Sequence, residues 1–237
     1  EPVIFFVDTF NKYYEPENIR STIKVLQKFG YEPFLPISKN DTLCCGRTFL
    51  SFGVLDKAKY EAQKIVNTFY PFLKKGISVV GIEPSCILTF RDEIPSIMRD
   101  KKSDLLRKNS FTFEELLEKK LSKVKFMPSQ KKVLLHGHCH QKAFDAMKPI
   151  LKILKEIPKI NFEVIDTSCC GMAGAFGYNK STYDISIKMA NDKLIPFIKK
   201  QKEDVIIIAD GTSCRTQIKD GSNRSAMHFS RFLENLI

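Results

Sequence analysis

The sequence contains the same ordered set of motifs twice, and this constrains the fold more than any other feature. The hexapeptides DTLCCG at 41–46 and DTSCCG at 166–171 lie 125 residues apart. Further matches follow in the same order: FYPFLKK at 69–75 with LIPFIKK at 194–200, and ISVVGIEPSC at 77–86 with VIIIADGTSC at 205–214. Chance does not produce several matches in one order, so we predict an internal duplication of one supersecondary unit.

Each copy alternates apolar runs with amphipathic segments. The runs at 3–8 and 133–138 are short and rich in β-branched, aromatic and leucine residues, which is typical of buried strands. Segments 17–28 and 54–75 carry apolar residues at helical spacing. We therefore predict an α/β fold with two pseudo-symmetric lobes, each a short parallel sheet flanked by helices. The cysteine loops are expected at the carboxyl ends of the strands, where such sheets place their sites.

The predicted boundaries are lobe 1 at 1–91, a helical connector at 92–130 and lobe 2 at 131–237. The connector has no counterpart in the repeat, and Ser110 or Thr112 is expected to cap a helix that begins near Phe113. Residues 99–132 hold 11 Lys or Arg against five Asp or Glu, more than half of the net charge of +11. A solvated Lys-rich face explains this, and a docking surface for an acidic partner is the alternative. Nucleic acid is disfavoured because no binding motif accompanies the charge.

Composition and cysteine usage exclude several classes of protein. A hydrophobic fraction of 43% excludes a disordered chain, and seven cysteines cannot all pair in disulfides. The adjacent pairs Cys44-Cys45 and Cys169-Cys170 suggest ligands in a reducing compartment. No apolar run approaches the ~20 residues of a transmembrane helix, and there is no signal peptide. We expect a cytoplasmic protein, with peripheral attachment at the inner face of the membrane as the alternative.

The cysteines divide into a set of four and a set of three. Four thiolates from three loops can close around one metal centre. In the first copy Thr9 stands where the second has its first cysteine, counted from Val3 and Val133. Any single cysteine is more simply a buried core residue, but four at matching landmarks favour a metal. The primary set is Cys139, Cys169, Cys170 and Cys214, and the secondary set is Cys44, Cys45 and Cys86.

These motifs resemble the CCG, or cysteine-rich, domain family over nearly the whole chain. The most specific parts are the two DTxCCG strings, HGHCHQKA at 136–143, and the Ser-Cys strings that end at Cys86 and Cys214. The likeness is closest to the C-terminal region of FAD-linked oxidases and the iron–sulfur subunit of glycolate oxidase, and the CCG-containing subunit of heterodisulfide reductase is related. The chain departs from the family's Cys-x-x-Cys pattern, because Glu83 and Gly211 replace its first cysteine.

The resemblance implies an iron–sulfur electron-transfer module of a flavin-linked 2-hydroxy-acid oxidoreductase, of lactate, glycolate or 2-hydroxyglutarate type. A [4Fe–4S] cluster would occupy the four-cysteine set, and FAD and a ferredoxin-like segment would lie in upstream domains of the same protein or complex. A chain that starts at Glu1 fits a fragment cut downstream of both. The fragment alone is then not expected to be catalytic, and no catalytic residue is assigned.

Other residues near the cysteines each have a functional and a structural interpretation. His138 and His140 are favoured over His136 as a ligand, proton carrier or hydrogen-bond donor, and a polar strand end is the alternative. Gly171 and Gly174 are expected to aim N–H groups at the site, or to form a plain turn. Arg215, like Arg47 and Arg91, would lower thiol pKa values or pair with cluster charge, if it is not simply a surface residue.

Two alternative functions stay open. A closed zinc site made of the four cysteines would make the chain a structural or interaction module. A thiol–disulfide reductase like the heterodisulfide reductase relatives is the other, and the missing cysteines at 83 and 211 weaken it.

Overall fold

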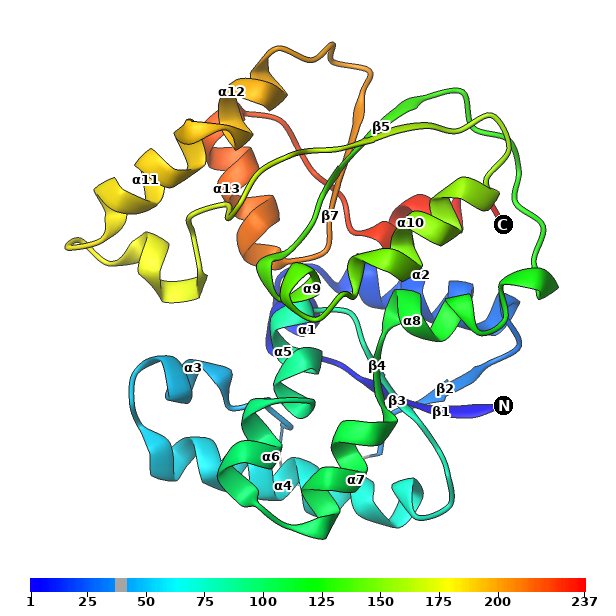
Figure 1. The fold of residues 1–237 in the computed structure, drawn as a ribbon. Coiled ribbons are helices and arrows are strands. Elements are labelled where there is room, and N and C mark those ends of the chain that lie inside the picture. Colours follow the sequence, from blue (N-terminus) through cyan, green and yellow to red (C-terminus); the bar gives the residue numbers. More distant parts are fainter. Residues whose placement is uncertain (37–41) are drawn as a thin grey trace. The chain divides into compact units, whose positions relative to one another are not determined.

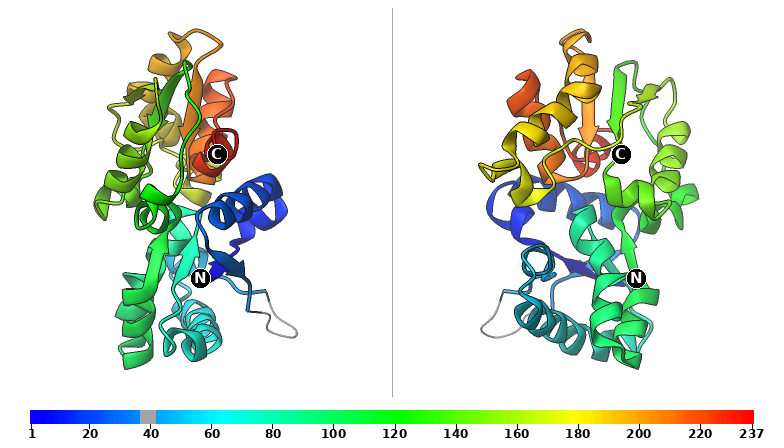
Figure 2. Two further views of the ribbon diagram at one scale, coloured as in Figure 1. Left: turned by 90° about the vertical axis from the view of Figure 1, so that its right-hand side faces the viewer. Right: turned by 60° about the vertical axis from the view of Figure 1, so that its left-hand side comes forward.

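The computed structural model describes residues 1–36 and 42–237, so Asp41 of the first hexapeptide lies outside the described residues. The chain divides into two compact units, unit 1 (Glu1–Val124) and unit 2 (Lys125–Ile237). Each contains a short parallel sheet with helices on its faces (Figures 1 and 2). The predicted α/β class, with two short parallel sheets flanked by helices, is confirmed.

Unit 1 is built around a four-stranded parallel sheet in the order β2–β1–β3–β4. The strands are β1 (Pro2–Phe6), β2 (Glu32–Phe34), β3 (Val79–Gly81) and β4 (Ser110–Thr112). The helices are α1 (Thr9–Tyr13), α2 (Pro16–Lys28), α3 (Arg47–Ser51), α4 (Leu55–Leu73), α5 (Pro84–Ile87), α6 (Glu93–Met98), α7 (Lys101–Asn109) and α8 (Phe113–Glu118), with 3-10 turns η1 (Leu88–Phe90) and η2 (Leu121–Lys123). In Figure 1, α4, α6 and α7 lie on one side of this sheet and α2 and α8 on the other.

Aromatic packing holds the helices of unit 1 to its sheet. Phe6 of β1 lies 4.8 Å from Phe90 and 6.4 Å from Phe69, measured between ring centroids. All three side chains are almost completely buried. Tilted and edge-to-face ring pairs at these separations stabilise a core beyond the area that they bury. The apolar residues predicted at helical spacing in 54–75 therefore form the face of α4 that covers the sheet.

Residues 92–124 belong to unit 1 and differ from the predicted separate connector. Ser110 of β4 pairs with Val79 of β3, so this stretch adds an edge strand to the sheet. Leu106, Phe113 and Leu117 are fully buried. A strand of three residues is too short to show an alternating pattern, which is why the sequence did not indicate it.

Unit 2 contains a three-stranded parallel sheet in the order β6–β5–β7. The strands are β5 (Lys132–His136), β6 (Asn161–Val164) and β7 (Ile206–Ala209). The helices are α9 (Cys139–Ala143), α10 (Met147–Glu156), α11 (Tyr183–Asp192), α12 (Leu194–Lys199), α13 (Thr212–Ser222) and α14 (Phe229–Glu234), with the 3-10 turn η3 (Gly174–Tyr178). Cys170 and Cys214 belong to the apolar cluster formed with residues of β7, α12 and α13.

The two sheets share one topology. The first strand of each unit is central, and the second and third strands flank it in parallel, as β2–β1–β3 and β6–β5–β7. Parallel neighbours end at the same edge, so the segments after β1 and β3, and those after β5 and β7, emerge side by side within their units. The segments after β3, β5 and β7 carry Cys86, Cys139 and Cys214, and the two CCG strings follow the flanking strands β2 and β6.

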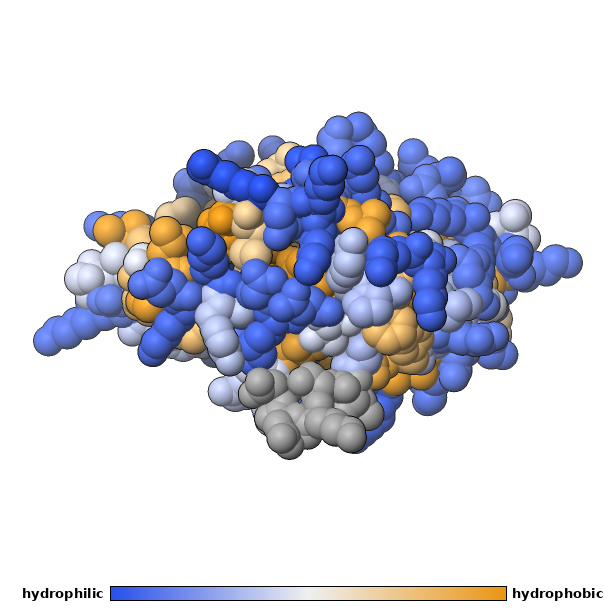
Figure 3. Space-filling model, turned by 90° about the horizontal axis from the view of Figure 1, so that it is seen from below, coloured by the Kyte–Doolittle hydropathy of each residue, from blue (hydrophilic) through white to orange (hydrophobic). Residues whose placement is uncertain are grey.

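Hydrophilic side chains cover most of the face seen in Figure 3, with a few apolar side chains between them. Among the described residues, no helix is both long and apolar enough to cross a lipid bilayer.

The start of α8 generates a test of local stability. Thr112 Oγ1 accepts a hydrogen bond from Glu115 N at 3.3 Å, and Glu115 Oε2 accepts one from Thr112 N at 2.9 Å. We expect Thr112→Ala to lower the free energy of unfolding by about 1 kcal/mol, because a buried helix end loses its cap. Urea denaturation followed by circular dichroism measures the loss. Thr112→Ser keeps the hydroxyl and is the control, and an equal loss in both variants would contradict the capping role.

Candidate metal centre

Three segments of unit 2 bring the four predicted cysteines to one edge of its sheet. Cys139 begins α9, three residues after His136, where β5 ends. Cys169 and Cys170 lie in the loop after β6, and Cys214 lies in the first turn of α13, directly after β7. The parallel topology thus gathers residues that are up to 75 positions apart in the sequence.

The four thiols form a continuous series of contacts. Cys139 contacts Cys169, Cys169 contacts Cys170, and Cys170 contacts Cys214 through their side chains. Cys170 and Cys214 are 3% and 1% exposed, whereas Cys139 and Cys169 are half-buried. The site therefore has an interior end in the apolar core and an outer end that faces solvent.

The direction of the pKa shift alternates along this series of thiols. Contacts with Cys139 and then Cys170 lower the pKa of Cys169 to about 2, aided by the N–H of Gly171. The contact with Cys170 holds the pKa of Cys214 well below its usual range, and His136 and His138 add to this effect. The contact with Cys169, and then burial, raises the pKa of Cys139. The contacts with Cys169 and then Cys214 raise the pKa of Cys170. A bound cation would replace the protons of these thiols.

The glycine of each CCG string shapes the loop around the first cysteine. Gly171 has φ +88°, and its N–H donates to Cys169 Sγ at 3.3 Å. Gly46 has φ +79°, and its N–H donates to Cys44 Sγ at 3.5 Å. Glycine adopts this left-handed backbone without steric cost. A Cβ at Gly171 would also lie 2.3 Å from the carbonyl oxygen of Ser186, so the position admits no side chain.

His136 is the histidine that the structure groups most closely with the sulfurs. One of its ring nitrogens and the Sγ atoms of Cys170 and Cys214 all lie within 4.8 Å of one another. The side chain of His136 is 1% exposed. The sequence favoured His138 and His140 over His136, because they lie nearer the loop. His136 is the last residue of β5, so it lies at the edge of the sheet where the cysteines gather. The two-residue periodicity of a strand allows its side chain to point toward them.

His138 and His140 lie at the start of α9. His138 caps this helix by accepting the N–H of His140 at its Nδ1, 3.2 Å away. The two rings stack with centroids 5.1 Å apart. The nearby His138 also contributes to the lowered pKa of Cys169, after the contacts with Cys139 and Cys170. His138 is therefore a structural cap and an electrostatic neighbour of the thiols.

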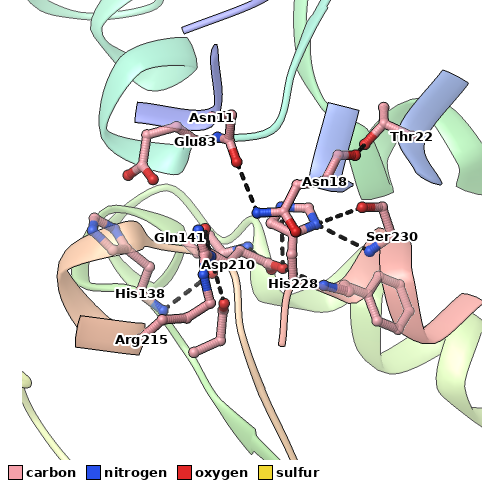
Figure 4. Close-up of polar contacts among 12 residues, drawn as sticks. Asn11, Asn18, Thr22, Glu83, His138, Gln141, Asp210, Arg215, His228 and Ser230 are labelled. Atoms are coloured by element: carbon pink, nitrogen blue, oxygen red, sulfur yellow. Dashed lines mark hydrogen bonds and ion pairs between the residues drawn. The ribbon is translucent and has the colours of Figure 1, made fainter. Parts of the chain in front are cut away.

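A buried polar network supports the capped start of α9 (Figure 4). Gln141 Oε1 accepts the N–H of His138 at 3.1 Å, and Gln141 Nε2 donates to Asp210 Oδ2 at 2.9 Å. Asp210 Oδ1 accepts the N–H of Phe229 at 3.1 Å and faces Nε2 of His228 at 3.5 Å. Sequence reasoning missed this network, although Asp210 directly follows a predicted strand.

The remaining predicted residues contact groups other than the sulfurs. The buried Arg215 donates to the carbonyl oxygens of Ala209 and Asp210 at 2.8 and 2.6 Å, so it holds the end of β7. The N–H of Gly174 donates to Ser213 Oγ at 3.2 Å. Arg47 and Arg91 form ion pairs with Glu93 and Glu115. A cation that the sequence did not single out, Lys142, donates to the carbonyl oxygens of Thr167 and Ser168, just before the CCG string.

The matching site of unit 1 has a different charge balance. Cys45 Sγ and Cys86 Sγ lie 3.1 Å apart and are buried. Asp8, at the position of His138, caps α1, and Glu83 caps α5, and both carboxyl groups are buried. The contact with Cys45 lowers the pKa of Cys86, but burial and the two carboxylates outweigh it and raise that pKa. Sequence reasoning named Glu83 only as a missing cysteine and did not single out Asp8.

The donor set of unit 2 therefore fits a metal centre, and that of unit 1 fits less well. Thiolates and an imidazole are soft and borderline ligands that suit iron–sulfur centres, zinc and copper. In the described part of unit 1, no three His, Cys, Asp or Glu ligand atoms come as close together as they do around Cys170.

Comparison with known proteins assigns the second unit to a class. Residues 133–219 match the family model described as the cysteine-rich domain, CCG. The predicted resemblance to this family is therefore confirmed.

The relatives include a dehydrogenase subunit, a dehydrogenase and an iron–sulfur protein. One subunit of the anaerobic glycerol-3-phosphate dehydrogenase of Escherichia coli is 30% identical over 233 residues, which is 96% of this chain and 57% of that protein. The D-2-hydroxyglutarate dehydrogenase of Haemophilus influenzae is 28% identical, over 92% of this chain and 21% of that protein. An uncharacterized iron–sulfur protein of Methanocaldococcus jannaschii is 23% identical, over 86% of this chain and 38% of that protein. The chain thus spans little more than half of the first relative and less of the others.

The crowding at Gly171 predicts a difference between two glycine substitutions. Gly171 and Gly174 both have positive φ, but nothing lies within 4 Å of a Cβ at Gly174. We expect Gly174→Ala to lower the free energy of unfolding by about 1 kcal/mol and Gly171→Ala by about 3 kcal/mol, because only the latter meets backbone atoms. Thermal and urea denaturation of the metal-free chain compare them. Equal losses would show that the CCG loop has room for a side chain.

The carboxyl group of Asp8 predicts a pH dependence of stability. Burial, and then the nearby Glu83, raises the pKa of Asp8 from 3.8 to about 6. The folded state holds this proton more tightly than the unfolded state, so the resulting stabilisation is complete below pH ~4 and is lost as pH rises through ~6. Relative to Asp8→Asn, which still caps α1, the wild type should lose roughly 2–3 kcal/mol between about pH 4 and 8. Urea unfolding with a reductant across this range measures the difference, and parallel stability curves would contradict it.

Proposed function

We propose that this chain is the iron–sulfur electron-transfer part of a flavin-linked dehydrogenase. The observation that carries the proposal is the series of four contacting thiols, Cys139 to Cys214, within a CCG domain. Four cysteine thiolates are the ligand set of a [4Fe–4S] centre. The similarity to a dehydrogenase subunit and to an iron–sulfur protein supports the same class of function.

The chain's own residues would bind the centre and tune its charge. A bound [4Fe–4S] centre would supply one-electron storage. Gly171 N–H donates to Cys169 Sγ, and such hydrogen bonds raise the potential of a thiolate-bound centre. Lys142 holds the loop before Cys169 and places a positive charge beside the sulfurs. The buried Cys170 and Cys214 exclude water at the inner end, while the half-buried Cys139 and Cys169 leave an outer end for electron exchange.

The flavin, the organic substrate and the electron acceptor would belong to other parts of the protein or complex. The chain matches only a segment of D-2-hydroxyglutarate dehydrogenase and just over half of a glycerol-3-phosphate dehydrogenase subunit. Both names describe oxidation of an anionic alcohol. We therefore propose a 2-hydroxy acid of lactate, glycolate or 2-hydroxyglutarate type as the substrate of the partner. The 30% identity to the glycerol-3-phosphate dehydrogenase relative makes glycerol 3-phosphate the second candidate.

A direct test is metal analysis of the anaerobically reconstituted chain with electron paramagnetic resonance. We expect ~four iron atoms per chain and a paramagnetic signal on reduction. Cys170→Ser should abolish the signal, because Cys170 contacts two other thiols of the site. Zinc near one atom per chain, with no visible absorption, would instead support the structural zinc module.

Cys45→Ser is the matched control, because Cys45 holds the same place in the CCG string of unit 1. We expect this variant to keep the signal. A signal that survives Cys170→Ser but disappears with Cys45→Ser would move the centre to unit 1. Iron-free chain after every reconstitution would overturn the proposed function.

A further inference from the structure

We propose that His136 is a nitrogen ligand of the metal centre of unit 2, beside Cys170 and Cys214. This inference rests on the proposed function in one respect only, that unit 2 binds a metal. It adds a donor to the four thiols that the CCG motif supplies and makes the site a mixed nitrogen and sulfur site.

The first support is that the buried ring meets sulfur, because His136 forms a side-chain contact with Cys214. His136 is 1% exposed, and its Nε2 has no nitrogen or oxygen hydrogen-bond partner among the described residues. Burying a polar ring nitrogen without such a partner costs free energy. The ligand atoms grouped with the ring are the sulfurs of Cys170 and Cys214, all within 4.8 Å. A metal between these three atoms would satisfy Nε2.

The second support is the hydrogen bond on the other side of the ring. Nδ1 of His136 lies 3.2 Å from the hydroxyl of Thr167. A hydroxyl can accept, so Nδ1 can carry the proton and donate it to Thr167. Nε2 then presents its lone pair to the sulfurs. Histidine ligands are oriented in this way, with the remote N–H held by an oxygen.

His138 has the opposite arrangement and serves as a comparison. Its Nδ1 accepts a backbone N–H, that of His140, which cannot act as an acceptor. The proton of neutral His138 therefore sits on Nε2, which leaves no lone pair for a metal. A Cβ built at Gly211 would lie 2.4 Å from Cδ2 of His138 and 3.4 Å from Cys214 Sγ. The ring thus lies beside the site, in space that a side chain at position 211 would need.

Pulsed electron paramagnetic resonance of the full chain tests the assignment. The chain is made with 15N-labelled or unlabelled histidine, loaded anaerobically with iron and sulfide, and reduced. We expect a strong nitrogen hyperfine coupling that changes with the isotope. His136→Cys should lose this coupling, keep the iron and shift the reduction potential downward, because thiolate replaces imidazole. His138→Asn retains a helix cap and should keep the coupling.

The outcomes separate this inference from the proposed function. An iron–sulfur signal without strong nitrogen coupling in the wild type would overturn the role of His136 and leave the electron-transfer proposal standing. Coupling that survives His136→Cys, or disappears in His138→Asn, would also overturn the assignment.

If every reconstitution gives zinc and no iron–sulfur signal, the proposed function fails and zinc X-ray absorption decides the ligand. Imidazole scattering that is present in the wild type and lost in His136→Cys would support His136. Its absence from the wild type would overturn the inference.

Discussion

Four thiols that contact one another in series create the condition on which the rest of unit 2 depends. Neighbouring thiols cannot all ionise in a buried place without a compensating charge. In the metal-free chain the contacts in this series lower the pKa of Cys169 and Cys214 and raise the pKa of Cys139 and Cys170. A bound cation would supply the compensating charge. The apolar cluster around Cys170 and Cys214 makes that replacement favourable, because it keeps the competing solvent away.

The parallel sheet is what brings the sulfurs together. The strands end at the same edge of the sheet. The residues that follow β5 and those that follow β7 therefore lie at this edge. The caps then hold these residues in register: His138 starts α9, Gln141 ties it to Asp210, and Asp210 follows β7. The polar network therefore connects two of the three segments that carry the four cysteines.

The two units share one backbone arrangement around their cysteines but differ in the charged groups beside them. The CCG glycine makes the same left-handed turn in both, and the same N–H to sulfur bond. At the cap after the first strand, unit 2 has His138 and unit 1 has Asp8. A carboxylate beside thiols raises their pKa, and an imidazole lowers it. This change adds to the contrast between the two sites, after the sulfur contacts and burial.

The sequence by itself determined the repeat, the α/β class and the cysteine sets, because all three depend on local patterns and fixed spacings. It also indicated a helix cap at Ser110 or Thr112, of which Thr112 is the one observed, and the helix that α4 forms. Only the tertiary structure decided that Ser110 to Thr112 join a sheet, that Arg215 holds the end of β7, and that His136 meets Cys170 and Cys214. The physical reason is that these contacts join segments distant in the chain. Whether a polar side chain at a strand end meets solvent, a carbonyl oxygen or a sulfur depends on which strand lies beside it.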